Sequence, residues 1–137
     1  MGEAEARGDW IKALRAFEKH LSKLISIEAL IVHGSACRSG LGPTSDIDVL
    51  VISDDFENLA LHKRLSILEE ARVERIQALG YTFSELEKMV LRANPLALGA
   101  LVEGIMITSS ERIQQLKERA KKMYIRQGRV WKPSSSQ

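Results

Sequence analysis

Two apolar runs separated by a glycine-containing loop constrain the fold of this chain more than any other feature. Residues 27–32 are β-branched and apolar, and they are too few for a helix. Residues 46–53 alternate between polar and apolar and then become continuously apolar. The residues between them, 37–45, contain Gly40, Gly42 and Pro43, which favour a loop. We therefore expect two buried strands joined by this loop.

The remaining segments predict helices and strands in alternation. Helical spacing, capping residues and β-branched runs predict helices over residues 10–24, 59–72, 85–93, 95–104 and 109–128, and strands over residues 74–81 and 105–108. Asp9 is the expected cap of the first helix, and Ser84 with Glu87 forms an expected capping box. This order indicates an α/β (α+β) fold, a small mixed sheet packed with helices.

Length and composition favour one folded domain. The 137 residues predict a single domain over residues 1–128, with a mobile start over 1–8 and a C-terminal tail over 129–137. No apolar stretch approaches the roughly 20 residues that cross a membrane, and we expect no secretory leader. Cys37 is the only cysteine, which excludes an internal disulfide and fits a reducing, cytoplasmic setting.

A pair of acidic residues at the start of the second run is the first candidate for chemistry. Asp46 and Asp48 are two residues apart on a predicted strand, so both carboxylates face the same side. Two like charges this close repel, and a cation between them relieves the repulsion. Carboxylate oxygens without cysteine ligands suit Mg²⁺ or Mn²⁺.

Residues at the end of the first run are suited to binding phosphate. Gly34 has no side chain, so phosphate oxygens can approach the backbone N–H groups closely. Ser35 supplies a hydroxyl, and Arg38 can hold a phosphate through two donors. His33 either contacts phosphate or base or makes ordinary hydrogen bonds at the strand end. Phosphate binding beside metal-binding carboxylates indicates phosphoryl or nucleotidyl transfer.

The same residues resemble a known family. The stretch Gly34-Ser-Ala-Cys-Arg38, followed after a loop by Ser45-Asp-Ile-Asp-Val-Leu-Val51, resembles the signature of minimal nucleotidyltransferases in the DNA polymerase β-like superfamily. Residues 101–107 resemble a strand near the end of these proteins. The resemblance implies a nucleotidyltransferase-like fold. It also implies transfer of a nucleoside monophosphate, AMP by preference, from a nucleoside triphosphate to a hydroxyl on a protein or RNA.

The resemblance also implies roles and partners. Asp46 and Asp48 would be catalytic and bind two Mg²⁺ ions, while Gly34, Ser35, Arg38 and Ser45 would bind the nucleotide. Many small prokaryotic relatives are paired with HEPN-domain proteins. A HEPN-domain protein is therefore an expected partner, with this chain as the antitoxin of a toxin–antitoxin pair.

One departure from the family pattern favours a function other than nucleotidyl transfer. Residues 76–82 resemble the family segment that carries a third metal-binding aspartate, and Gln77 stands at that position. An amide supplies neither charge nor a base. Glu74 could substitute through a bulge, and Glu85 at the next helix start is another option. The alternative is a non-catalytic nucleotidyltransferase-like module that binds a protein partner.

Charge is unevenly distributed along the chain. Residues 111–137 carry a net charge of +6, whereas residues 1–110 carry −4. The basic end is either a solvated helix face or a surface for RNA. A homo-oligomer is also compatible with the pattern, and an exposed apolar helix stripe would indicate one.

Overall fold

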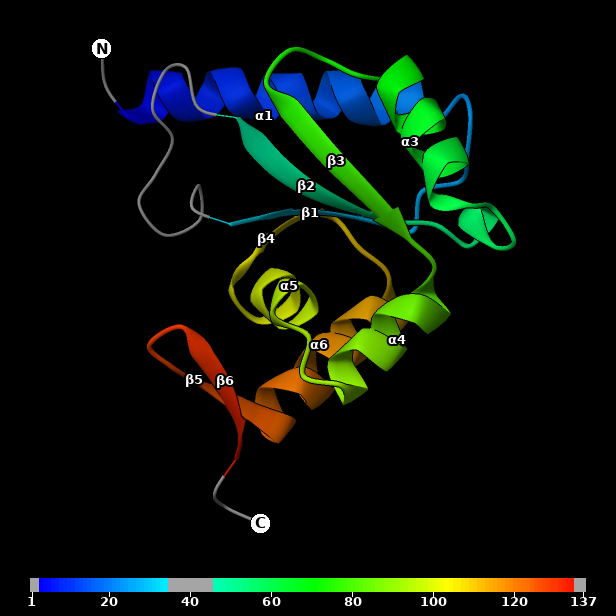
Figure 1. Cartoon of the computed structure of the whole chain (residues 1–137). Coiled ribbons are helices and arrows are strands. Elements are labelled where there is room, and N and C mark those ends of the chain that lie inside the picture. The colour runs from blue at the N-terminus through cyan, green and yellow to red at the C-terminus, as the bar shows by residue number, and fades with distance from the viewer. Residues whose placement is uncertain (1–2, 35–45, 135–137) are drawn as a thin grey trace.

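A four-stranded mixed sheet forms the centre of the computed structural model, which describes residues 3–34 and 46–134 (Figure 1). Its strands are β1 (Ala29–His33), β2 (Ile47–Ile52), β3 (Ile76–Tyr81) and β4 (Ile105–Thr108), in the order β3-β2-β1-β4. β1 is antiparallel to β2 and β4, and β2 is parallel to β3. The expectation of a small mixed sheet packed with helices is confirmed.

Two helices cover one face of the sheet. They are α1 (Glu3–Leu21) and α3 (Leu61–Glu70), and both lie above the sheet in Figure 1. Leu14 and Phe17 of α1 and Leu68 of α3 pack in one buried cluster with Val49 and Val51 of β2. This face receives alternate residues of each strand, as the two-residue period of a strand requires.

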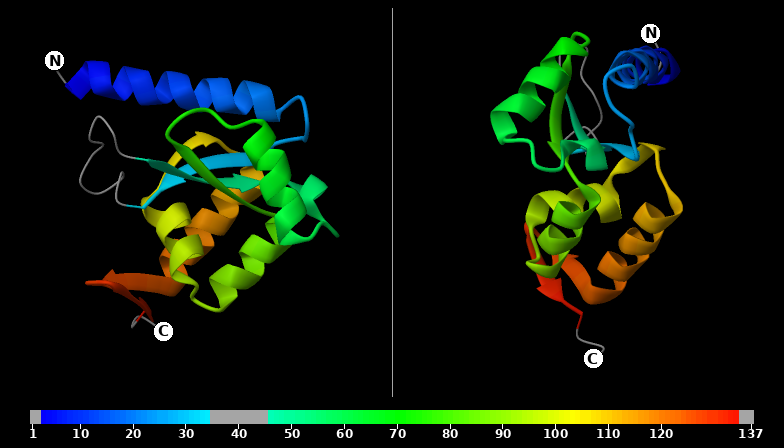
Figure 2. Two further views of the ribbon diagram at one scale, coloured as in Figure 1. Left: turned by 45° about the horizontal axis from the view of Figure 1, so that its top comes forward. Right: turned by 90° about the vertical axis from the view of Figure 1, so that its right-hand side faces the viewer.

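Three helices cover the opposite face. They are α4 (Phe83–Leu91), α5 (Pro95–Leu98), which continues into a π-helical turn over Gly99–Glu103, and α6 (Glu111–Met123). Ile31, Leu50 and Ile52 of the sheet pack against these helices in a second buried cluster. Figure 2 shows the sheet between the two helical layers. Because helices lie on both faces, the strands are apolar on both sides, which explains the continuous apolar run in β2.

Several predicted boundaries were wrong. α1 begins at Glu3, so the predicted helix start at Trp10 was wrong. β3 begins at Ile76 rather than at Glu74. The capping box of α4 uses Thr82 and Glu85, two residues earlier than the predicted pair Ser84 and Glu87.

The C-terminal segment also differs from the prediction. α6 ends at Met123, and residues 124–133 form a hairpin of β5 (Tyr124–Gln127) and β6 (Val130–Pro133). Gly128, with φ +63°, lies in the turn of this hairpin rather than ending a helix. The tail predicted from residue 129 is therefore strand over residues 130–133. The apolar residues of Tyr124–Gln127 continue the spacing of α6, which is why the sequence predicted helix there.

None of the helices within residues 3–34 and 46–134 is long and apolar enough to cross a membrane.

Candidate functional site

Asp48 lies at the centre of the candidate site because of the register of three strands. It is the second residue of β2 and pairs with His33 at the end of β1 and with Gln77 of β3. Ile47 and Val49, on either side of it, are buried against α1 and α3. Asp48 therefore faces the other side of the sheet, where it is half-buried.

Asp46 immediately precedes β2 and is exposed. Continued alternation along β2 would place its carboxylate on the same face as that of Asp48. In Figure 1 this end of the sheet is at the left, where β1 ends and β2 begins. Within the described part of the chain, neither aspartate has a lysine or arginine partner in an ion pair. Their negative charges consequently remain available to attract a cation.

Gly34 makes a close approach to Asp48 that a residue with a side chain would make only with strain. Its φ of +81° lies in the left-handed region, which side chains other than glycine rarely adopt. A Cβ atom on Gly34 would lie 2.9 Å from Oδ2 of Asp48. The backbone after β1 therefore passes directly beside the carboxylate, and the absent side chain keeps that oxygen accessible from this side.

His33 contributes no positive charge to the site near neutral pH. It is half-buried, and burial lowers its pKa below the usual 6.5, while the nearby negative charge of Asp48 acts in the opposite direction. The imidazole is therefore mostly neutral at pH 7, so it does not neutralise Asp48. The cross-strand pairing of His33 with Asp48 was missed from the sequence. Its only signal was the position of His33 at a strand end.

Gln77 lies where the resemblance places a third carboxylate. It pairs with Asp48 in the parallel ladder, and its side chain is exposed. Within residues 3–34 and 46–134, no group of three histidine, cysteine, aspartate or glutamate side chains could hold a metal ion. Residues 35–45 contain no aspartate or glutamate in their sequence, so that segment cannot supply the missing carboxylate.

The two glutamates considered as substitutes are both placed elsewhere. Glu74 is exposed and precedes β3, and it joins no metal-binding group with the two aspartates. Glu85 follows Tyr81, at the end of β3 remote from Gln77, and forms two hydrogen bonds with Arg64, at 2.6 and 3.0 Å. The hypothesis that Glu85 completes the metal site is therefore wrong.

The predicted phosphate-binding residues Ser35, Arg38 and Ser45 lie outside the described residues, as does Cys37. Of the sequence-predicted site, the structure thus brings Gly34, Asp48 and Gln77 together, with Asp46 next to them. Hard oxygen donors and an accessible carboxylate fit Mg²⁺ or Mn²⁺. Two carboxylates and one amide, however, form a donor set with less charge than three carboxylates.

The sequence matches the family model of the nucleotidyltransferase domain over residues 14–97, which is more than half of the chain. This range includes β1, β2 and β3 and hence the whole candidate site. The chain therefore belongs to the nucleotidyltransferase domain family. No curated protein is similar enough to count as a relative.

Solved structures support the same fold. A protein from Sulfolobus solfataricus assigned as a nucleotidyltransferase superposes with a TM-score of 0.61 at 14% identity, over 80% of this chain and 89% of that chain. A toxin–antitoxin protein crystallised with AMP-PNP superposes with a TM-score of 0.52 at 16% identity, over 80% of this chain and 84% of that chain. At such low identity the likeness shows the fold alone.

Proposed function

We propose that this chain is a Mg²⁺-dependent nucleotidyltransferase that moves a nucleoside monophosphate from a nucleoside triphosphate, with ATP as the favoured donor, to a hydroxyl on a protein or RNA. The observation that carries the proposal is the placement of Asp48 between the Gly34 turn and Gln77 on adjacent strands, with Asp46 two residues away. Family membership supports the reaction class.

In this proposal Asp46 and Asp48 hold the metal through their carboxylate oxygens, and the amide oxygen of Gln77 is a weaker donor. A Mg²⁺ ion held by these residues would supply positive charge to offset the triphosphate and would lower the pKa of an acceptor hydroxyl. Gly34 leaves room for phosphate oxygens, while Ser35, Arg38 and Ser45 bind the triphosphate. The acceptor oxygen bonds to the α-phosphorus, and the bond from that phosphorus to pyrophosphate breaks.

A specific observation favours a second candidate, a non-catalytic module that binds nucleotide and a protein partner. The position opposite Asp48 on β3 carries the neutral Gln77, and no other described carboxylate replaces it. Without that charge, nucleotide binding can persist while transfer becomes slow, because transfer demands more charge stabilisation than binding.

The partner proposal rests on likeness and on charge. The similar protein crystallised with AMP-PNP is part of a toxin–antitoxin system, so we propose a HEPN-domain toxin as the protein partner. RNA is the other candidate acceptor, because Arg129 and Lys132 are exposed on the β5–β6 hairpin. Its tip points to the same end of the molecule as the candidate site (Figure 2). We also propose that the chain forms a single domain. We propose a cytoplasmic location as well, which the lone cysteine favours.

The proposal is tested with ATP labelled on the α-phosphate. The protein is incubated with Mg²⁺, a co-expressed HEPN partner and total RNA, and label on each macromolecule is measured. Asp46→Asn should abolish labelling, whereas Glu57→Gln, an equally conservative change at an exposed carboxylate elsewhere, should not. Labelling that survives Asp46→Asn would refute the metal site. Mg²⁺-dependent ATP binding without any labelling would favour the non-catalytic module.

A further inference from the structure

His33 and Asp48 lie side by side on one face of the sheet. Ile31 of β1 pairs with Leu50 of β2, and both are buried in the cluster that packs against α4, α5 and α6. Two residues closer to the start of β2, His33 pairs with Asp48 in the same ladder. Because side chains alternate along a strand, this pair projects from the same face as Ile31 and Leu50. Directly opposed side chains of an antiparallel pair are close enough to contact one another.

The carboxylate of Asp48 is turned toward the end of β1. The three atoms nearest to a Cβ built on Gly34 all belong to Asp48, and Oδ2 is the nearest of them at 2.9 Å. Gly34 directly follows His33, so this oxygen lies beside the backbone that carries the imidazole. The negative charge of Asp48 also raises the pKa of His33, against the larger lowering effect of burial. These observations place the imidazole and the carboxylate at one site.

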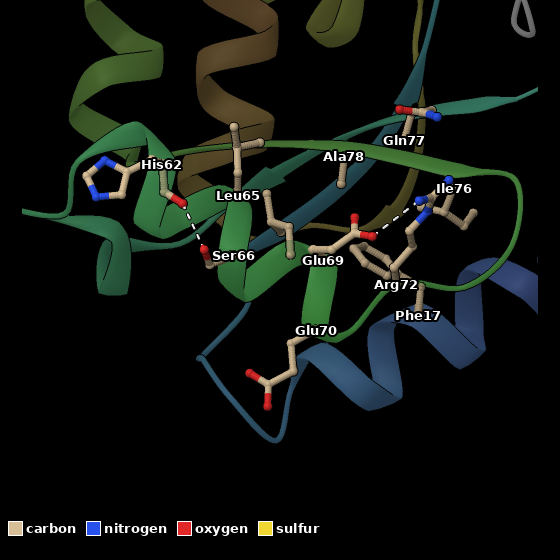
Figure 3. Close-up of a pocket in the computed structure, with 11 residues that line it drawn as sticks. Phe17, His62, Leu65, Ser66, Glu69, Glu70, Arg72, Ile76, Gln77 and Ala78 are labelled. Carbon is tan, nitrogen blue, oxygen red and sulfur yellow. Dashed lines mark hydrogen bonds and ion pairs between the residues drawn. The ribbon is translucent and has the colours of Figure 1, made fainter.

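Gln77 lies on the other side of Asp48. It pairs with Asp48 in the parallel ladder of β2 and β3. Figure 3 shows its side chain on the opposite side of β3 from those of Ile76 and Ala78. The carboxylate of Asp48 is therefore flanked by an amide on β3 and by an imidazole on β1.

The imidazole and the carboxylate are free to bind a ligand. Within residues 3–34 and 46–134, the side chains of His33 and Asp48 form no ion pair or hydrogen bond with another residue. The ring of His20, in contrast, contacts the carbonyl of Ala71 at 3.3 Å. No fully buried polar side-chain atom in the described part of the chain lacks a partner. The unbonded nitrogen and oxygen atoms of this half-buried pair are consequently accessible from solvent.

We propose that His33 coordinates, through an imidazole nitrogen, the same metal ion that Asp48 binds. This inference rests on the proposed function, because it concerns the ion of that site. Mg²⁺ takes oxygen ligands, whereas imidazole favours transition-metal ions. His33 therefore gives the site a preference for Mn²⁺ over Mg²⁺, and it supplies a ligand on β1 in place of the carboxylate that Gln77 lacks on β3.

The imidazole and the carboxylate alone do not complete the coordination of an ion. Among the residues that the structure describes, no group of three histidine, cysteine, aspartate or glutamate side chains could hold a metal. Mn²⁺ takes about six ligands. Phosphate oxygens of a nucleoside triphosphate and water are available to supply others, so we expect tight binding of Mn²⁺ only when the nucleotide is present.

The first test detects the nitrogen ligand directly. Protein labelled with ¹⁵N in its histidines is mixed with Mn²⁺ and α,β-methylene ATP, which cannot transfer its nucleoside monophosphate. Pulsed electron paramagnetic resonance then measures the nuclei coupled to Mn²⁺. We expect a coupled ¹⁵N that disappears in His33→Phe and persists in His62→Phe. His62 is the matched control because it is exposed on α3, beside a hollow of about 860 Å³ on the opposite face of the sheet (Figure 3).

Two negative outcomes of this test are distinguishable. Protein-bound Mn²⁺ without a coupled ¹⁵N would overturn the role of His33 and leave the proposed function standing. Absence of protein-bound Mn²⁺, with or without the nucleotide, would overturn both.

The second test compares two metal ions. Calorimetry measures the binding of α,β-methylene ATP to the parent and to His33→Phe, in Mn²⁺ and in Mg²⁺. Removal of the nitrogen ligand should weaken binding in Mn²⁺ by about 10-fold or more and change binding in Mg²⁺ by less than about 2-fold. Equal losses in the two metals, or no loss in Mn²⁺, would contradict coordination by His33. Urea unfolding of the same variant checks that its fold is kept.

Discussion

Acidic residues at the two ends of the central sheet differ in whether they are bonded to arginines. At the end where β2 finishes, Glu28, Asp54 and Glu85 are all bonded to arginines. At the end where β2 begins, Asp46 and Asp48 have no such partner within residues 3–34 and 46–134. The paired acids stabilise the fold. The unpaired acids retain a negative potential at a glycine turn, which is what a cation-binding site requires.

At the end of the sheet where β2 finishes, arginine–carboxylate contacts join elements that are remote in sequence. Arg112 of α6 donates two hydrogen bonds to Glu28 before β1 and one to Asp54, and its guanidinium lies 4.1 Å from the ring centroid of Phe83. These contacts hold the pKa of both carboxyls below the usual range, with the hydrogen bond from Arg112 as the main cause. Arg64 lowers the pKa of Glu85 in the same way.

The largest effect that we predict comes from the unpaired end. Asp48→Asn should lower nucleotidyl transfer by at least about 100-fold, because a metal-binding carboxylate is lost. The same variant should unfold at the same denaturant concentration as the parent or a higher one, since a like-charge repulsion is removed. Parallel transfer assays and urea titrations measure both effects. A marked loss of stability would mean that Asp48 belongs with the structural acids.

The second-largest predicted effect is a loss of stability at the end of the sheet where β2 finishes. Arg64 is only 6% exposed and bonds to Glu85 and to the carbonyls of Leu59 and Gly80. Arg64→Met preserves much of the side-chain volume but leaves these acceptors without their donor, which should cost about 2 kcal/mol of the free energy of unfolding.

Arg119→Met is the matched control for this prediction. It breaks an ion pair with Glu87 in which both side chains are largely exposed, so the expected cost is below about 0.5 kcal/mol. Urea unfolding measures both variants. Equal costs would show that burial does not distinguish these pairs.

A smaller effect is expected at Gln77, which lies beside the unpaired acids. Gln77→Asp adds a carboxylate next to Asp48 on the adjacent strand. If transfer is limited by missing charge at the metal, its rate should rise roughly 10-fold, and Gln77→Asn should give no rise. Unchanged transfer in Gln77→Asp would indicate that the neutral residue does not limit the reaction.

The smallest effect concerns pH. The lowered pKa values of Glu28 and Asp54 stabilise the fold above the unfolded-state pKa values near 4, and this stabilisation is lost as the pH falls through the folded-state values. Arg112→Gln removes the main cause of both shifts. Acidification should lower the free energy of unfolding of both proteins. The decrease should be smaller in the variant by only about 0.5 kcal/mol, because Asp54 is largely exposed. Thermal unfolding from pH 6 to about pH 3 provides the comparison; parallel curves would show that Arg112 does not cause the shifts.

Local sequence pattern was sufficient to predict the strands and part of the candidate site. The alternation in residues 46–53 correctly predicted that Ile47 and Val49 are buried opposite Asp48. The resemblance of residues 76–82 to a family segment correctly placed Gln77 beside Asp48. The first prediction rests on strand periodicity, which depends on neighbouring residues alone, and the second rests on the resemblance.

Long-range pairing could not be predicted in the same way. The partner of Glu85 is Arg64, 21 residues earlier, and the partner of Glu28 is Arg112, 84 residues later. No local pattern specifies such pairs, which is why Glu85 was a candidate metal ligand until the structure placed it at the other end of β3. The β5–β6 hairpin was missed because Tyr124 and Ile125 fit a helical apolar spacing as well as a strand.

The central claim is that Asp46 and Asp48 form a metal-dependent nucleotide site, and calorimetric titration with ATP tests it most directly. The protein is titrated with ATP in Mg²⁺ and again in EDTA, and Asp48→Asn is titrated in Mg²⁺. We expect binding in Mg²⁺, loss of binding in EDTA and loss of binding in the variant. Absence of ATP binding up to millimolar concentration, or binding that is equal in EDTA and in Asp48→Asn, would contradict the account.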